Sequence, residues 1–236
     1  MKDTADQHFH AENWDAPIVD QHFSRCQFVD VSFVDCQFET ATFIHCAFTR
    51  CRFDSATLRQ CSFEHCEFYD RETEEACSFR FASFPQSTFK HCDLSLASFC
   101  RANLYELSVE QSQLTGADLS YSSNAKSISN KVTMNSCTIS DCNFSYADLT
   151  GACLDYAEMT DNRLQHAILN QASLIGANLS DCELHGIEAT GLVINDADLR
   201  GADIGGLDIR EIDVQGVKIN DYQQRLLLEA IGMEVD

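Results

Sequence analysis

A five-residue period runs through most of the chain and limits what it can fold into. Large apolar residues, mostly Phe and later Leu or Ile, recur at every fifth position, and a small residue stands two places before nearly every one. Neither the 3.6-residue turn of an α-helix nor the two-residue period of a strand fits this spacing. A solenoid whose coils have four sides of five residues does fit it, with the large residue, here called the centre, pointing inward. The period therefore predicts an all-β fold, a quadrilateral β-helix.

The period is broken at two places, and we predict a projecting loop at each. The centre Phe79 follows the one before it by eleven residues instead of five, so six residues are inserted. The second lapse comes at Asn124 and Ser129, which stand at centre positions but are polar and are not expected to pack a core. The same register resumes at Met134 or Ile139.

These breaks divide the chain into three predicted parts with one continuous core. Residues 1–15 lack the repeat and are expected to form a flexible or loosely docked N-terminal extension. Residues 16–219 form the β-helix, with loops at about 69–76 and 122–136. Residues 220–236 form a C-terminal helix and tail.

The thirteen cysteines suggest disulfides or a metal site, but their positions favour packing. Eleven of them occupy the small inward position, where Cys alternates with Ala and Ser. His-Cys pairs such as His45-Cys46 place the imidazole outward and the thiol inward, so the two cannot converge on one ion. We therefore expect free thiols, no metal and no other cofactor.

The end of the chain leaves the repeat and predicts a short helix over residues 220–232. Asp221 is its expected N-cap, with Gln224 as capping-box partner, and Gly232 suits its C-terminal end. Apolar residues exceed what covering the last coil requires, and an uncapped β-solenoid end would stack on other chains. A tail-to-tail homodimer is expected, with simple capping as the alternative. The expected interface residues are Tyr222, Leu226, Leu227, Ile231 and Met233.

The chain carries 37 acidic and 16 basic residues, a net charge of −21. A β-helix rises about 4.8 Å per coil, and duplex DNA carries one charge per about 1.7 Å. The rod therefore has a charge density of the same order as a duplex. Such a rod is repelled by nucleic acid and attracted to proteins with DNA-binding grooves. No direct nucleic acid binding is expected, and high charge for solubility alone is the plain alternative.

Other function classes are disfavoured. No G-x-S-x-G elbow, no H-E-x-x-H motif and no phosphate-binding glycine loop occurs, so the chain is not expected to be an enzyme. No apolar run is long enough to span a membrane, and the polar start lacks a signal-peptide core. A cytoplasmic protein is expected.

The repeat resembles that of pentapeptide-repeat proteins over almost the whole chain. Residues 66–72 followed by 77–79 are similar to the first-loop region of the Qnr-type quinolone-resistance proteins, and residues 91–95 resemble a stretch that follows it there. The end of the chain, from residue 207 to Leu227, resembles that family's terminal coil and dimer helix. The N-terminal extension is longer than in that family, and the Ser- and Lys-rich second loop does not match it residue by residue.

The resemblance implies a right-handed four-sided β-helix that dimerises through its tail. It also implies a DNA-mimicking protein that binds DNA gyrase and topoisomerase IV and protects them from quinolones, with the two loops making the contacts. The implied partner-binding residues are Tyr69, Asp70, Arg71, Glu72, Thr73, Glu74 and Glu75 in the first loop and Asn124, Lys126, Ser127, Ile128, Asn130 and Lys131 in the second. Two alternatives stay open: a DNA mimic that inhibits gyrase, and a structural scaffold for another partner.

Overall fold

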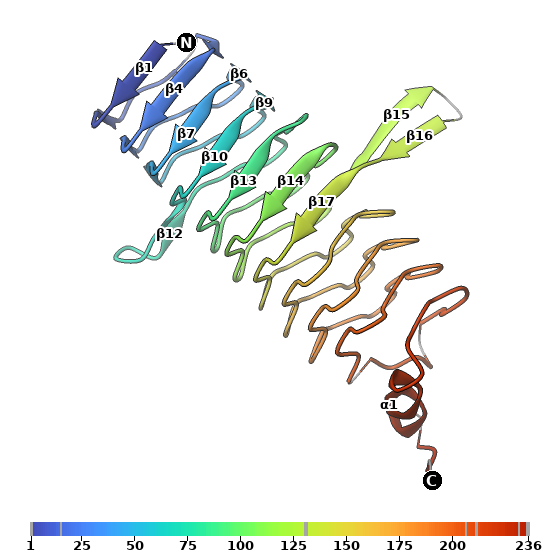
Figure 1. The fold of residues 1–236 in the computed structure, drawn as a ribbon. Helices are drawn as coiled ribbons and strands as arrows, with labels where there is room; N and C mark the ends of the chain where they lie inside the picture. The colour runs from blue at the N-terminus through green and yellow to red at the C-terminus, as the bar shows by residue number, and fades with distance from the viewer. Residues whose placement is uncertain are drawn as a thin grey trace.

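The protein is a rod-shaped parallel β-solenoid with one helix at its C-terminal end (Figure 1). The computed structural model describes residues 2–14, 16–129, 132–205, 207–210, 212–230 and 232–234. The predicted all-β, four-sided β-helix with two projecting loops and a C-terminal helix is confirmed.

The four sides are numbered here in chain order within a coil, and each side ends at a corner with the same number. Side 1 is a seven-stranded parallel sheet, side 2 and side 4 carry three-stranded parallel sheets near the N-terminus, and side 3 is held by isolated parallel bridges such as Ser32–Arg52 and Ser78–Ser98. Side 1 contains β1 (Lys2–Ala5), β4 (Gln21–Ser24), β7 (Thr42–Ile44), β10 (Ser62–Glu64), β13 (Thr88–Lys90), β14 (Leu107–Glu110) and β17 (Cys137–Ser140). Side 2 contains β2 (His8–His10), β5 (Gln27–Val29) and β8 (Ala47–Thr49), and side 4 contains β3 (Ile18–Val19), β6 (Gln37–Glu39) and β9 (Thr57–Arg59).

The register of side 1 measures the length of each coil. Phe23 pairs with Phe43, and Phe43 with Phe63, so each of these coils contains 20 residues. The pairs Phe63–Phe89 and Val109–Ile139 are separated by 26 and 30 residues, whereas Phe89–Val109 between them keeps the separation of 20. The first insertion is therefore the six residues that the sequence predicts, and the second is ten.

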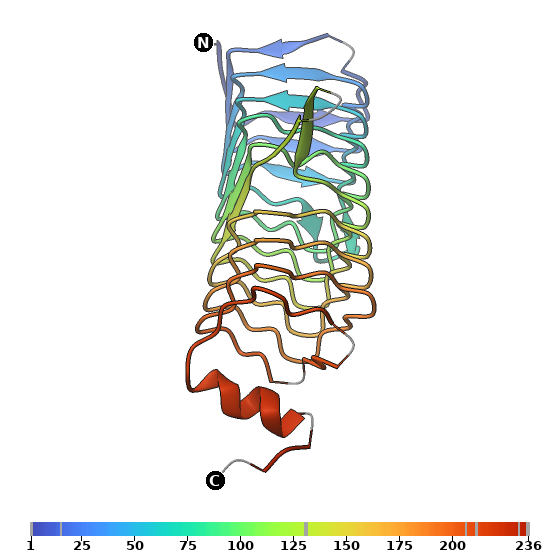
Figure 2. The same ribbon diagram turned by 90° about the vertical axis from the view of Figure 1, so that its right-hand side faces the viewer.

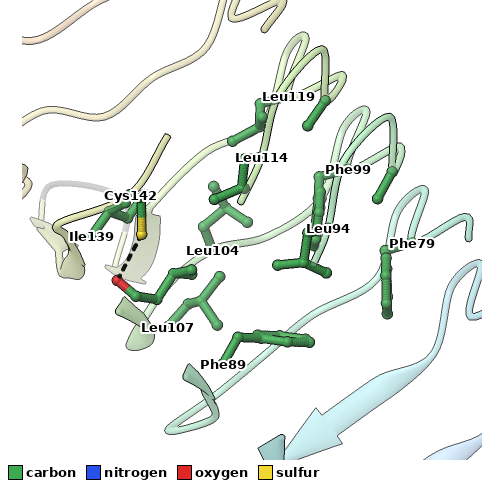
Figure 3. Close-up of a cluster of buried hydrophobic side chains, with 14 of the residues drawn as sticks. Phe79, Phe89, Leu94, Phe99, Leu104, Leu107, Leu114, Leu119, Ile139 and Cys142 are labelled. Carbon is green, nitrogen blue, oxygen red and sulfur yellow. Dashed lines mark hydrogen bonds between the residues drawn. The ribbon is translucent and has the colours of Figure 1, made fainter. Parts of the chain in front are cut away.

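The core is a set of stacked centres. Phe rings of successive coils lie face to face, for example Phe23 on Phe43 at 4.9 Å and Phe43 on Phe63 at 4.8 Å between centroids. These spacings match the rise of about 4.8 Å between neighbouring strands. Later coils replace Phe by Leu and Ile, and Figure 3 shows Phe79, Phe89 and Phe99 giving way to such residues. The stack is continuous, so the rod has one core.

The small inward residue has a second role besides filling space. One column of small residues precedes the side 2 centres. Where such a residue is Cys or Asn, its side chain donates a hydrogen bond to the carbonyl oxygen of a side 1 centre in the preceding coil. The thiol of Cys66 donates to Phe43 at 3.4 Å, and that of Cys142 to the main-chain oxygen of Val109 at 3.6 Å (dashed line in Figure 3). An unpaired buried carbonyl is unfavourable. This explains why Cys and Asn, rather than only Ala, occur in this column; Ser112 of the same column instead donates to the carbonyl oxygen of Glu110 in its own coil, at 2.8 Å.

The N-terminal segment differs from the expected extension, because residues 2–14 form a first coil. Strand β1 pairs with β4, and β2 pairs with β5. Phe9 stacks on Phe28 at 4.8 Å, and Trp14 packs against Phe33 at 5.3 Å. Phe9 and Phe28 are only 19 residues apart, so this coil is one residue short. That single missing residue takes the segment out of the five-residue register.

Helix α1 (Gln223–Ala230) lies below the last coil (Figure 2). Its capping differs from the prediction by one residue: Gln223, not Gln224, reaches back, and its Oε1 accepts a hydrogen bond from the main-chain nitrogen of Asn220 at 2.7 Å. The fully buried Gln223 also donates to two carbonyl oxygens of the coil, Leu199 and Ala202, both at 2.8 Å. Gly232, with φ of +86°, ends the helix as expected.

Candidate functional site

The two loops leave the rod at diagonally opposite corners. Loop 1 (residues 69–76) follows the side 2 centre Phe68 and precedes Ser78 of side 3, so it lies at corner 2. Loop 2 (residues 125–135) follows Ser123 of side 4 and precedes β17 of side 1, so it lies at corner 4. They project to opposite sides of the rod in Figure 1. A single flat partner surface therefore cannot contact both loops in the same way.

Loop 1 is a small hairpin formed by β11 (Tyr69–Asp70) and β12 (Glu75–Ala76). Asp70 Oδ1 accepts a hydrogen bond from the main-chain nitrogen of Glu72 at 2.9 Å, which lowers the pKa of the Asp70 carboxyl. Tyr69 and Asp70 are half-buried, and residues 71–75 are exposed. The loop is thus an ordered projection whose tip meets solvent.

Two arginines join loop 1 to the rod. Arg71 Nη2 donates to Asp93 Oδ2 at 3.0 Å, and Asp93 raises the pKa of this guanidinium. Arg50 binds Asp30 with two hydrogen bonds of 2.6 and 2.8 Å and also lies 3.5 Å from Glu75. These are exposed surface ion pairs, which contribute little to stability. Their main effect is to fix where the loop lies.

A hollow of about 390 Å³ lies beside loop 1 and is mostly polar. It is bounded by both the rod and the loop, at Ala47, Phe48, Thr49, Glu67, Tyr69, Asp70, Arg71, Glu72 and Asp93. Its acidic side chains outnumber the one cation, Arg71, so it favours a partner that brings positive charge.

Loop 2 is a longer hairpin formed by β15 (Ala125–Ser129) and β16 (Val132–Asn135), with an irregularity between Ser127 and Ser129. It exposes three apolar side chains: Ile128 at 53%, Val132 at 50% and Met134 at 51%. Met134 therefore does not restart the core; Ile139, which is buried, does. Sequence reasoning missed Val132 and Met134 as candidate contact residues, because both are apolar and stand at positions that would point inward if the repeat were unbroken.

Lys126 is bound to the rod more closely than its sequence suggests. Its Nζ lies 4.9 Å from the ring centroid of Tyr105, within the range of a cation–π interaction. Tyr105 is 7% exposed at the base of the hairpin. Ser127 and Ile128 are exposed, while the expected contacts Asn130 and Lys131 lie outside the described residues.

The structure corrects the role expected for Asn124. The sequence suggests it as a partner contact that cannot pack a core, but its side chain is fully buried at a centre position. Its Nδ2 donates to the carbonyl oxygen of Asp155 at 2.9 Å, and its Oδ1 accepts from Asn135 Nδ2 at 3.3 Å. Hydrogen bonding satisfies the amide there, so Asn124 cannot touch a partner directly.

The expected dimer residues fall on two sides of α1. Tyr222, Leu226 and Met233 are exposed, at 64%, 42% and 53%. Leu227 is half-buried and packs on its own coil, where it borders an apolar cavity of about 120 Å³ with residues such as Ile204. Ile231 lies outside the described residues.

Corner 1 carries a column of like charges. Asp141, Asp161 and Asp181 stack there in successive coils, linked by main-chain hydrogen bonds, and all three side chains are exposed. Strand rise places them about 4.8 Å apart. The acids are twenty residues apart in sequence, so only the four-sided coil reveals that they form one edge.

Four exposed apolar residues border side 3 and escape sequence reasoning: Phe81, Leu96, Tyr121 and Tyr146. Each stands two residues after a centre, where the backbone φ is positive. The guanidinium of Arg101 lies 5.3 Å from the Tyr121 ring centroid. Their shared signal is a large apolar residue at a corner position, where most coils have a polar residue or Gly.

Two kinds of site are missing from the parts of the chain that the structure describes. No group of three or more His, Cys, Asp or Glu side chains that could hold a metal ion occurs there. Within the same residues, no helix is long and apolar enough to cross a membrane.

Comparison with known families identifies the repeat. A family model of pentapeptide repeats matches in eight copies, over residues 22–60, 82–120, 142–181, 157–191 and 177–216. The two internal stretches that it leaves out, 61–81 and 121–141, contain the two loops. No curated protein matches by sequence.

Three solved structures of QnrB1, a plasmid-mediated fluoroquinolone resistance protein, are similar over the whole chain. The full-length protein has a TM-score of 0.77 at 25% identity, with 98% of this chain and 100% of that chain covered. A trypsin-treated variant gives 0.74 at 28% identity, with 100% and 99% covered. A second trypsin-treated variant gives 0.71 at 30% identity, with 98% and 100% covered.

Proposed function

Because the chain belongs to the pentapeptide-repeat family and has the Qnr architecture, we propose that it binds DNA gyrase and topoisomerase IV and protects them from quinolones. The observation that carries this proposal is the likeness to QnrB1 over the full length, at 25–30% identity. The protein acts as a binding partner, without catalysis or a cofactor, in the cytoplasm.

The loops are the proposed contacts, because they are where this rod departs from a regular solenoid. A passive spacer has no need of two ordered projections. Loop 1 offers the charged residues 71–75, and loop 2 offers Ile128, Val132 and Met134, three apolar side chains that are half-exposed. Exposed apolar groups of this kind are typical of protein–protein contacts. Diagonal placement suits a partner that surrounds the rod or contacts it on two sides.

DNA mimicry is the proposed reason for recognition. The net charge of −21 and the aspartate column at corner 1 repel nucleic acid and attract the basic groove that holds DNA in a topoisomerase. Tail-to-tail association through Tyr222, Leu226 and Met233 would give a homodimer that matches a two-fold target.

The test is DNA supercoiling by gyrase at a fixed inhibitory dose of a fluoroquinolone, with this protein titrated in. Recovery of supercoiling at concentrations well below any inhibition is the expected result. Inhibition without recovery would identify a gyrase-inhibiting DNA mimic instead, and no effect at all would refute the proposal.

Two variants, one for each loop, separate the contributions of loop 1 and loop 2 to protection. Ala125 and Asn135 face each other, so replacing residues 126–134 by an Asn-Gly turn closes the hairpin at its base. Asp70 and Glu75 also face each other, so residues 71–74 can be replaced in the same way. Both variants should keep the circular dichroism and melting temperature of the rod and lose protection. Full protection by both would refute the role of the loops.

A further inference from the structure

Asn124 is an unusual residue for its position. The centres above and below it on side 4 are Leu104 and Leu154, and both are buried apolar residues. Asn124 is equally buried, with no exposed surface. An amide in a core contributes nothing that leucine does not, unless its hydrogen bonds serve a purpose.

Its hydrogen bonds join the base of loop 2 to the next coil. The side chain joins Asn135, the last residue of the hairpin, to the carbonyl oxygen of Asp155 in the next coil. The main-chain oxygen of Asn124 accepts from the nitrogen of Ser136 at 3.2 Å, and its nitrogen donates to Cys153 at 3.0 Å. One residue therefore connects the start of the hairpin, its end and the coil below.

We propose that Asn124 is a positioning residue that fixes the direction in which loop 2 leaves the rod. A ten-residue insertion makes a break in the coil, and the two ends of the hairpin need a common anchor there. The amide supplies it, because it donates downward to the next coil and accepts sideways from Asn135. The importance of that direction for a partner rests on the proposed function of loop 2.

Other contacts do not replace this anchor. Lys126 Nζ over the Tyr105 ring fixes only the first strand, and the hydrogen bond from the Ala125 nitrogen to Ser123 Oγ at 3.2 Å lies on the same side. On the returning strand, Asn135 makes the side-chain bond to Asn124. The main-chain bonds of Ser136, to the Asn124 oxygen at 3.2 Å and from the Glu106 nitrogen at 2.7 Å, hold the chain only after the hairpin has ended. Removal of the amide should therefore free the hairpin while leaving its first residue in place.

The test compares Asn124→Leu, which restores the apolar pattern of the column, with wild type and with Asn162→Ala. Asn162 is also a buried amide, but it lies in a later coil and does not touch loop 2. The measurements are the urea midpoint, the rate of trypsin cleavage after Lys126, and the concentration that protects gyrase. A looser hairpin exposes the Lys126 bond whether or not gyrase is a partner.

For Asn124→Leu we expect an unchanged or higher urea midpoint. We expect roughly tenfold faster cleavage after Lys126, since losing one or two buried hydrogen bonds changes an opening equilibrium by about that factor. The protective concentration should rise by a similar factor. Asn162→Ala should do the reverse, with a lower midpoint but wild-type cleavage and protection under native conditions.

Wild-type cleavage and protection in Asn124→Leu would overturn the inference. Should that variant fold poorly, Asn135→Ala decides, because it removes the same hydrogen bond from a half-buried hairpin residue outside the core. If wild-type protein does not protect gyrase, the proposed function fails, while the cleavage rates still decide whether Asn124 positions the hairpin.

Discussion

The buried amide of Asn162 provides a direct test of how the coils are held together. Its Oδ1 accepts a hydrogen bond from the main-chain nitrogen of Cys142 at 2.9 Å, and its Nδ2 donates to the carbonyl oxygen of Ile139 at 2.8 Å. The side chain is 1% exposed, so bulk water does not reach these two main-chain groups. The substitution Asn162→Ala leaves both main-chain groups buried and unpaired.

The expected loss is large for one side chain. A buried donor or acceptor without a partner costs about 1–3 kcal/mol, so two of them lower the free energy of unfolding by about 2–6 kcal/mol. Serine is the matched control, because Ser112 in the same column accepts from the Cys92 nitrogen at 3.0 Å and donates to the Glu110 carbonyl at 2.8 Å. Asn162→Ser should therefore restore a partner for the Cys142 nitrogen but not for the Ile139 carbonyl oxygen, and recover about half of the loss.

Urea unfolding followed by far-UV circular dichroism measures the change, and amide hydrogen exchange locates it. Exchange should accelerate in the coils that contain Ile139 and Asn162, since a solenoid is stabilised by contacts between neighbouring coils. If Asn162→Ala had the same urea midpoint as wild type, or as Asn162→Ser, the reasoning would be refuted. The small inward residues before the side 2 centres would then not stabilise the rod through their hydrogen bonds.

Three further predictions follow from other parts of the rod. Gly151→Ala should lower the free energy of unfolding by about 1–2 kcal/mol, since φ is +64° and a Cβ would lie 2.7 Å from Cε1 of Tyr121. A urea titration measures this, and an unchanged midpoint would contradict the reasoning from φ. Burial raises the pKa of the Cys137 thiol to about 12, so the stability that its neutral form gives is complete below the ordinary thiol pKa and is lost as pH rises toward about 12. The urea midpoint of wild type should fall between about pH 8 and about pH 10.5. It should fall by less in Cys137→Ala, which has no thiol to ionise and so does not lose the thiol's pH-dependent contribution of about 2 kcal/mol. Equal falls in the two proteins would contradict this. Leu226→Glu should give monomers by light scattering with an unchanged melting temperature, whereas Leu227→Glu should destabilise the last coil; dimers that persist in Leu226→Glu would place the interface elsewhere.

The sequence alone determines the solenoid, because every side of every coil repeats the same local requirement. A large residue fills the interior and a small one fits beside it, so a period of five is enough to specify four sides and a single core. The six-residue insertion before Phe79 is readable for the same reason, since a break in a strict period is visible without coordinates. The buried thiols are readable too, because Cys alternates with Ala at the inward position.

The sequence misleads where a coil departs from the five-residue pattern. The N-terminal coil is one residue short, which hides Phe9 and Trp14 from a five-residue search although both pack on the core. Asn124 looks like a surface residue because it is polar, but its hydrogen bonds to Asn135 and Asp155 allow it to be buried.

Only the tertiary structure decides which distant residues share a surface. The loops stand at opposite corners because an insertion after side 2 and an insertion after side 4 leave the square coil in different directions. Asp141, Asp161 and Asp181 become one acidic edge because a coil holds twenty residues and brings each above the next. Such surfaces depend on how the coils stack, whereas the five-residue pattern specifies only which side chains point inward.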